Sequence, residues 1–147
     1  MKYTGPVYRP PVEHDSLLLQ VTVGCAHNKC TFCTMYKDVK FQVESLEQVE
    51  ADLKEARRHY AKVPRIFLVN GDAFVLSADR LNAIAAKIIE YFPECGTIAM
   101  YASIRNIMSK SDQELHELRE LRINDLYVGL ETGTAEVITK INKGYTL

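Results

Sequence analysis

The sequence predicts an α/β protein in which parallel strands form a partial, open βα barrel. Four short apolar segments alternate with four segments whose apolar residues recur every three or four positions. Such alternation is typical of βαβ units, whose consecutive strands run parallel. Polar residues suited to chemistry also follow the four predicted strands. Because ligands of parallel sheets bind beyond the carboxyl ends of the strands, we expect these residues to gather on one rim.

Bulk composition narrows the class of protein. The 147 residues suffice for one domain with a buried core, and 47% hydrophobic and 25% charged residues are ordinary for a soluble globular protein. A formal net charge of −1 gives no electrostatic reason to expect binding to nucleic acid or to an anionic membrane surface. No apolar run has the length of a membrane span, and the N-terminus lacks the apolar region of a signal peptide.

An N-terminal arm precedes the predicted core. Residues 1–15 contain three prolines and no usable period, so we expect an extended arm that lies against the core, residues 16–147. The apolar run at residues 16–23 predicts the first buried strand. The loop that follows this strand runs to about Phe41.

The middle of the chain predicts two helices with a strand between them. Ser45 and Gln48 have the spacing of a capping box, and the apolar residues of the helix that follows lie on one face. Residues 66–69 predict the second buried strand, and the polar residues 70–72 end it. A second amphipathic helix is expected at about residues 78–92, where a proline stops it.

The remaining residues predict two more βα units. Residues 97–102 form the third apolar segment, and Ser111 with Glu114 makes a capping box for the helix after it. Residues 123–130 predict the fourth strand, and a last helix begins at Gly133. Four βα units cannot close an eight-stranded barrel, so we expect an open arc, in a truncated chain or the first part of a longer protein.

Three cysteines, Cys25, Cys30 and Cys33, lie within nine residues directly after the first predicted strand. Thiolates this close in sequence meet one inorganic centre only if the chain wraps around it as a loop. A closed structural zinc site uses four protein ligands, whereas a 4Fe–4S cluster held by three cysteines leaves one iron open for a substrate or cofactor. The spacing therefore favours an iron–sulfur cluster with an exposed iron.

Other interpretations of these cysteines stay open at this point. His27 is a candidate fourth ligand of a zinc site, although it lies between the first two cysteines, where it seldom turns inward together with both. Free or redox-active thiols are a further alternative. A disulfide framework is disfavoured because three clustered thiols cannot all pair. Cys95 stands far off and is expected to be an ordinary small, partly buried residue.

The polar residues at the ends of the later strands are candidate ligand contacts. They are Asn70, Gly71 and Asp72 after the second strand, Ser103 and Arg105 after the third, and Glu131 after the fourth. Plainer roles compete with this one. Asp72 is also a good turn former beside Gly71, and Glu131 is also a cap acceptor for the last helix. Arg105 belongs either to a ligand shell or to a surface ion pair.

These residues resemble the radical SAM enzymes, a likeness that covers residues 8–145. The cysteine loop, with the aromatic Phe32 before its last cysteine, is similar to the cluster motif of that family. The stretches at residues 8–11, 19–22 and 129–133 resemble one branch, the iron–sulfur oxidoreductases similar to oxygen-independent coproporphyrinogen oxidase. The likeness implies a radical SAM-like partial barrel.

The resemblance also implies a cofactor and roles for single residues. The three cysteines would ligate a 4Fe–4S cluster whose open iron binds S-adenosylmethionine, and residues 70–72 would receive its methionine ammonium. Ser103 would make a polar contact, and Glu131 would contact the ribose hydroxyls. Lys143, twelve residues beyond Glu131, would pair with the cofactor carboxylate, with a solvated charge at a helix end as the alternative. The cluster would reductively cleave S-adenosylmethionine to a 5′-deoxyadenosyl radical that abstracts hydrogen from an unknown substrate.

Two departures from the family pattern affect the expected site. Four residues rather than three separate Cys25 from Cys30, and Asp72 replaces a glutamate, which shortens its reach by one methylene. We further expect an electron donor such as flavodoxin or ferredoxin, and a cytoplasmic location because such clusters are oxygen-sensitive. The rivals are a structural zinc-binding interaction module, made by the three cysteines and His27, and an inactive fragment of an enzyme.

Overall fold

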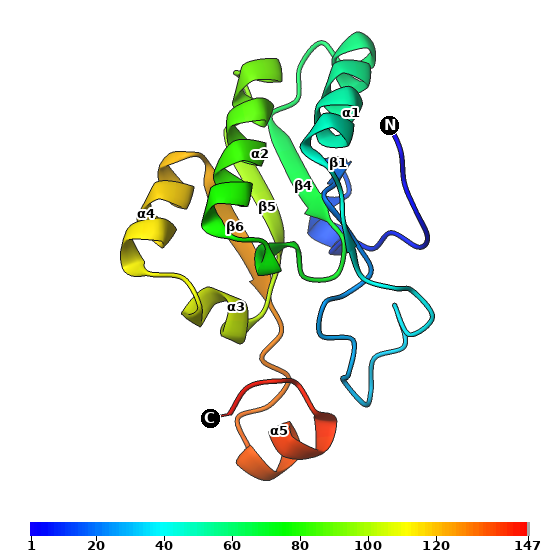
Figure 1. The fold of residues 1–147 in the computed structure, drawn as a ribbon, viewed down its shortest axis with the longest axis vertical. Coiled ribbons are helices and arrows are strands. Elements are labelled where there is room, and N and C mark those ends of the chain that lie inside the picture. The colour runs from blue at the N-terminus through cyan, green and yellow to red at the C-terminus, as the bar shows by residue number, and fades with distance from the viewer. Residues whose placement is uncertain (147) are drawn as a thin grey trace.

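The computed structural model describes residues 1–146, and its centre is an open sheet of four parallel strands (Figure 1). The strands are hydrogen-bonded in the order β1-β4-β5-β6, which leaves β1 and β6 at the two edges. Their bounds are Leu17–Gln20 for β1, Arg65–Val69 for β4, Thr97–Ala102 for β5 and Ile123–Val128 for β6. The predicted α/β fold with an open arc of parallel strands is confirmed.

Three helices cover one face of this sheet (Figure 1): α1 (Leu46–His59), α2 (Ala78–Tyr91) and α4 (Asp112–Glu120). A serine caps each of them by accepting a backbone N–H, as expected for helix starts. The capping box at Ser111 is complete, but the one predicted at Ser45 is half formed, because the Gln48 amide donates to Asp52 instead. Among the helices of residues 1–146, none combines the length and the apolar character that crossing a membrane needs.

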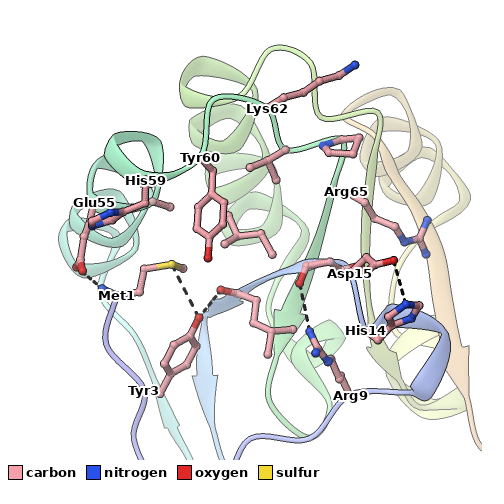
Figure 2. A pocket seen from close by; sticks show the side chains of 16 residues that line it. Met1, Tyr3, Arg9, His14, Asp15, Glu55, His59, Tyr60, Lys62 and Arg65 are labelled. Carbon is pink, nitrogen blue, oxygen red and sulfur yellow. Dashed lines mark hydrogen bonds and ion pairs between the residues drawn. The ribbon is translucent and has the colours of Figure 1, made fainter.

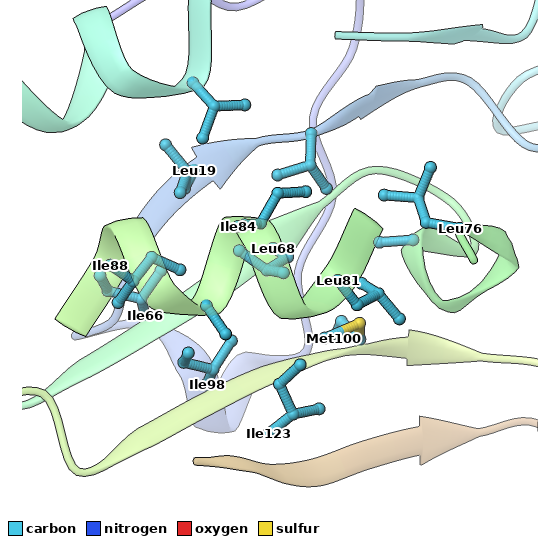
Figure 3. Packing of buried hydrophobic residues seen from close by; sticks show 14 of the residues in the cluster. Leu19, Ile66, Leu68, Leu76, Leu81, Ile84, Ile88, Ile98, Met100 and Ile123 are labelled. Atoms are coloured by element: carbon cyan, nitrogen blue, oxygen red, sulfur yellow. The ribbon is translucent and has the colours of Figure 1, made fainter. Parts of the chain in front are cut away.

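The main core lies between the sheet and these helices (Figure 3). Successive side chains of a strand point to opposite faces, so Ile66 and Leu68 of β4 pack toward the helices while Phe67 and Val69 face the other side. All four are fully buried. Both faces of the central strand are thus covered, which explains why its sequence is continuously apolar rather than alternating.

The second face of the sheet carries a buried ion pair from the N-terminal arm. Within that arm, η1 (Pro11–Glu13) is a short 3-10 turn that places Glu13, which is 0% exposed, against Arg65. Arg65 Nε donates to Glu13 at 2.8 Å, and Ser16 and Tyr127 also donate to this carboxylate. Arg65 also pairs with Asp125. The hydrogen bonds from Arg65 outweigh desolvation and hold the pKa of Glu13 at about 2.

Several local elements differ from the sequence-based expectation. The single strand predicted at residues 16–23 is divided, because the chain leaves the sheet at Val21 and continues as β2 (Thr22–Val23). This segment pairs antiparallel with β3 (Gln42–Val43), which closes the neck of the cysteine loop, residues 24–41. The predicted fourth strand ends two residues early, at Val128. Two short helical elements were not predicted, η2 (Ala73–Val75) and α3 (Ile104–Met108), whereas the predicted last helix is present as α5 (Ala135–Ile141).

Candidate functional site

Two cavities lie near opposite ends of the strands, and the larger has little chemistry to offer. It measures about 630 Å³ and lies where the N-terminal arm meets the starts of β1 and β4 and the end of α1 (Figure 2). Two ion pairs form within its lining, the amino group of Met1 with Glu55 and His14 with Asp15 at 3.0 Å, while Arg65 pairs with residues outside it. None of the site residues predicted from the sequence lines it.

The smaller cavity, of about 270 Å³, lies beyond the carboxyl ends of the strands, and we call it the rim cavity. All but two of the predicted site residues line it: Cys25, Cys30, Phe32, Cys33, Gly71, Asp72, Ser103, Glu131 and Lys143. The two exceptions are Asn70, which is buried behind the cavity wall, and Arg105, which is exposed. The parallel topology thus brings residues from four distant segments to one rim, as reasoned from the strand order.

The cysteine loop touches the end of β4 through a very close backbone contact at Gly71. A Cβ atom at this position would lie 2.5 Å from the Gly24 carbonyl oxygen and 2.8 Å from the Cα of Cys25, so only glycine fits. The Gly71 N–H donates to the Tyr36 phenol oxygen at 3.2 Å, and the same phenol donates to Asn70 Oδ1 at 3.5 Å. Burial raises the pKa of Tyr36 to about 12, so the phenol keeps its proton and this contact.

The other side of the cysteine loop is hydrogen-bonded to the end of α5. The Thr31 N–H donates to the Ile141 carbonyl at 3.0 Å, and the Asn142 amide donates to the Lys29 carbonyl at 3.1 Å. His27 Nε2 donates to the Asn142 carbonyl at 2.7 Å. The bonds from Thr31 and His27 satisfy carbonyl groups that a helix end leaves without intrahelical partners, whereas the Asn142 amide satisfies a carbonyl of the loop. The loop therefore depends on residues more than one hundred positions later in the chain.

The three thiols line one cavity without converging on one point. Within residues 1–146, no three histidine, cysteine or acidic side chains form a group that could hold a single metal ion. His27 also hydrogen-bonds through Nε2 to α5, so the zinc alternative is not favoured. Cysteine thiolates are also the ligands of iron–sulfur clusters, and all three cysteines line this cavity. Burial raises the pKa of the Cys30 thiol, and the nearby ammonium of Lys143 opposes this rise.

Asp72 lies in the wall of the rim cavity, and one of its carboxylate oxygens is not hydrogen-bonded within residues 1–146. The side chain is only 6% exposed, and its Oδ2 accepts a hydrogen bond from Asn106 Nδ2 at 2.5 Å. Its Oδ1 is buried without a hydrogen-bond partner among the described residues. Burial raises the pKa of Asp72, and the nearby polar groups of Ser103 and the Asn106 amide oppose the rise. A buried carboxylate with one free oxygen is suited to accept from a cationic donor of a ligand.

Glu131 and Lys143, predicted as separate ligand contacts, form an ion pair with each other. Their Oε1 and Nζ atoms are 2.7 Å apart, and the ammonium lies 5.6 Å from the centre of the Phe32 ring. Gly129 permits this arrangement, because a Cβ there would collide with the Glu131 carboxylate. Glu131 itself has a left-handed backbone, with φ 62°. In this structure, the opposite charges of Glu131 and Lys143 thus neutralise one another.

Two residues that hold the site in place, Asn106 and Tyr36, were not predicted as site residues, and only Asn106 has a sequence signal. Asn106 follows Ser103 by three residues, and the Ser103 hydroxyl oxygen accepts its backbone N–H at 3.2 Å as the cap of α3. That spacing is a helix-start signal, but the helix is too short to show a period. Tyr36 is 3% exposed and forms the inner wall of the cysteine loop, yet an aromatic residue in a loop has no pattern of its own.

One comparison with known proteins gives a match. The family model described as the radical SAM superfamily matches residues 19–147, which include the second half of β1, the other three strands of the sheet, the cysteine loop and every residue that lines the rim cavity. No match to a curated protein was found.

Proposed function

Because the chain belongs to the radical SAM superfamily, we propose that its rim cavity holds a 4Fe–4S cluster together with S-adenosylmethionine. The observation that carries this proposal is that one cavity is lined by three cysteines and by Asp72, whose carboxylate has one oxygen without a hydrogen-bond partner among the described residues. When bound, the two groups would supply an electron and a 5′-deoxyadenosyl radical for hydrogen abstraction from a substrate of unidentified structure. The protein's part is to bind, orient and shield them.

Cys25, Cys30 and Cys33 are the residues that would hold the irons. The additional residue between the first two cysteines is accommodated at Asn28, which adopts a left-handed backbone with φ 42°. Asparagine tolerates this conformation better than most residues, and its amide donates to the Tyr36 carbonyl at 2.7 Å. The longer spacing is therefore absorbed in a stabilised turn, and all three thiols still line the rim cavity.

The charged residues of the cavity suit the zwitterionic end of S-adenosylmethionine. Asp72 is positioned to accept from the ammonium, and Lys143 to donate to the carboxylate, once the ligand has replaced the bond between Lys143 and Glu131. Glu131 then becomes free to accept from the ribose hydroxyls. Ser103 uses its hydroxyl oxygen as a helix cap, which leaves its proton available for donation to an acceptor such as Asp72 or the ligand.

Finer assignments belong to the same proposal. The stretches at residues 8–11, 19–22 and 129–133 support an oxidoreductase of the branch similar to oxygen-independent coproporphyrinogen oxidase. Its electron would come from a donor such as flavodoxin or ferredoxin, in a reducing compartment such as the cytoplasm, because exposed clusters are sensitive to oxygen.

Formation of 5′-deoxyadenosine tests the proposal. We expect the chain, reconstituted anaerobically with iron and sulfide and reduced with dithionite, to convert S-adenosylmethionine to this product. The variant Cys30→Ala should lose the product, whereas Cys95→Ala, in which the changed residue is buried far from the rim, should keep it. Product no higher with the wild-type chain than with Cys30→Ala would contradict the proposal.

A further inference from the structure

We propose that Asn106 is a positioning residue, which holds Asp72 so that one carboxylate oxygen stays free for the ammonium group of the bound ligand. The inference rests on the proposed function. Asn106 donates to Asp72 Oδ2 at 2.5 Å, whereas Oδ1 has no hydrogen-bond partner among the described residues. Both side chains are more than nine-tenths buried. Asp72 lines the rim cavity and Asn106 does not, so Asn106 acts through Asp72 rather than on the ligand.

The position of Asn106 is fixed by several bonds to its own backbone. Its N–H donates to the Ser103 hydroxyl oxygen at 3.2 Å, which starts α3, and its carbonyl accepts from the Ser109 hydroxyl at 2.9 Å. Lys110 Nζ donates to the Phe74 carbonyl at 2.8 Å and lies 3.4 Å from the Asn106 carbonyl. Lys110 therefore joins η2, the turn directly after Asp72, to α3. The segments that carry Asn106 and Asp72 are thus fixed relative to one another.

The chemistry of the pair explains why an amide is useful at this position. An amide donates to one carboxylate oxygen without neutralising the charge, whereas a cation would compete with the ligand's ammonium. The two cations that face Asp72, Lys110 and Arg105, make no ion pair with it among residues 1–146. Asn106 thus holds the Asp72 carboxylate in one orientation, and the negative charge stays available to the ammonium group of the ligand. Without the amide, the buried carboxylate would lose its hydrogen bond from Asn106, which favours the protonated form.

Two variants separate positioning from folding. Asn106→Leu keeps the volume but removes the donor, and Asn106→Asp keeps the shape but places a second carboxyl beside Asp72. Asn124→Leu is the matched control, because the Asn124 amide donates to the Gly96 carbonyl at an exposed site away from the rim cavity. Asp72→Asn gives the effect of losing the carboxylate itself. If Asn106→Leu does not fold, the isosteric Asn106→Asp carries the test.

Calorimetric binding of two ligands to the cluster-reconstituted chain gives the first readout. S-Adenosylmethionine carries the ammonium, whereas 5′-methylthioadenosine lacks the amino-acid part. We expect Asn106→Leu to weaken S-adenosylmethionine binding at least about tenfold, the effect of losing a hydrogen bond to a charged group, and to leave 5′-methylthioadenosine binding within about twofold. Equal weakening of both ligands, or no weakening of either while Asp72→Asn weakens the first, would overturn the positioning role.

The second readout needs neither ligand nor cluster. Carbon-13 NMR of the Asp72 carboxyl reports its pKa directly, and we expect this pKa to rise in Asn106→Leu and further in Asn106→Asp, with no change in Asn124→Leu. A wild-type chain that binds no S-adenosylmethionine would contradict the proposed function, and this titration would then decide the role of Asn106 by itself. An Asp72 pKa equal in the wild-type chain and in both Asn106 variants would overturn the positioning role.

Discussion

The sheet and the cysteine loop are stabilised in different ways. The sheet buries continuous apolar strands between three helices and the N-terminal arm, so most of its stability comes from removing apolar surface from water. The cysteine loop has no regular structure between Gly24 and Phe41 and is held by polar contacts to Gly71 and to the end of α5. We therefore expect mutations to affect the fold and the site separately. Substitutions in the core should unfold the molecule, whereas substitutions at the loop contacts should move the cysteines and leave the sheet intact.

The largest effect is expected in the core. Leu68→Ala removes a fully buried side chain from the central strand and leaves a cavity, so we expect a loss of about 2–5 kcal/mol in the free energy of unfolding. Denaturant unfolding measures it. A loss below about 1 kcal/mol would contradict the assignment of the main stability to this layer.

Loss of the ion pair between Glu13 and Arg65 should lower the free energy of unfolding by a comparable amount, and this loss should depend on pH. Glu13 has a pKa of about 2 in the folded chain and about 4.5 when unfolded. Because the folded pKa is lowered, its stabilisation is complete above pH 4.5 and is lost as pH falls toward 2. We expect Glu13→Gln to cost about 3 kcal/mol near neutral pH and to flatten this acid dependence.

Glu136→Gln is the control for the buried ion pair. Glu136 also pairs with a cation, Lys140, but both side chains are exposed, so its loss should change the unfolding free energy by less than about 0.5 kcal/mol. Acid-unfolding profiles that coincide for the wild-type chain and Glu13→Gln would show that the Glu13 pair does not stabilise the fold.

Gly71→Ala tests the contact between the sheet and the cysteine loop. A methyl group here overlaps Gly24 and Cys25, so we expect the cysteine loop to move away, with loss of cluster incorporation and a cost of about 1–3 kcal/mol. Gly133→Ala is the matched control, since a Cβ there meets nothing within 4 Å. Iron and sulfide analysis after reconstitution measures the effect. Equal cluster content in both variants would show that Gly71 does not set the loop.

The smallest effect is local. Asn142→Gly keeps the left-handed backbone at the end of α5 but removes the amide that donates to the Lys29 carbonyl. We expect about 1 kcal/mol less protection in the cysteine loop, measured by hydrogen exchange, and no change in strands β4 and β5. Reduced protection spread evenly over loop and strands would mean that the two regions do not open separately.

The sequence predicted the sheet and the rim because both follow from regular patterns. The long helices show an apolar period with serine caps, and parallel strands place their carboxyl ends together whatever the details of the loops. The rest depends on distant partners. The strand at residues 16–23 divides because the Val21 carbonyl accepts a hydrogen bond from Glu44, which follows β3. Glu131 meets Lys143 only after α5 has folded back. Asn106 lies on a five-residue helix that shows no period.

The most direct test of the central claim, that the rim cavity holds a cluster with an open iron, is low-temperature EPR of the anaerobically reconstituted, reduced chain. We expect a reduced 4Fe–4S signal that changes shape when S-adenosylmethionine is added, because the ligand binds at the iron that has no cysteine. A chain that takes up about one zinc instead and gives no such signal, or a cluster signal indifferent to S-adenosylmethionine, would contradict the account.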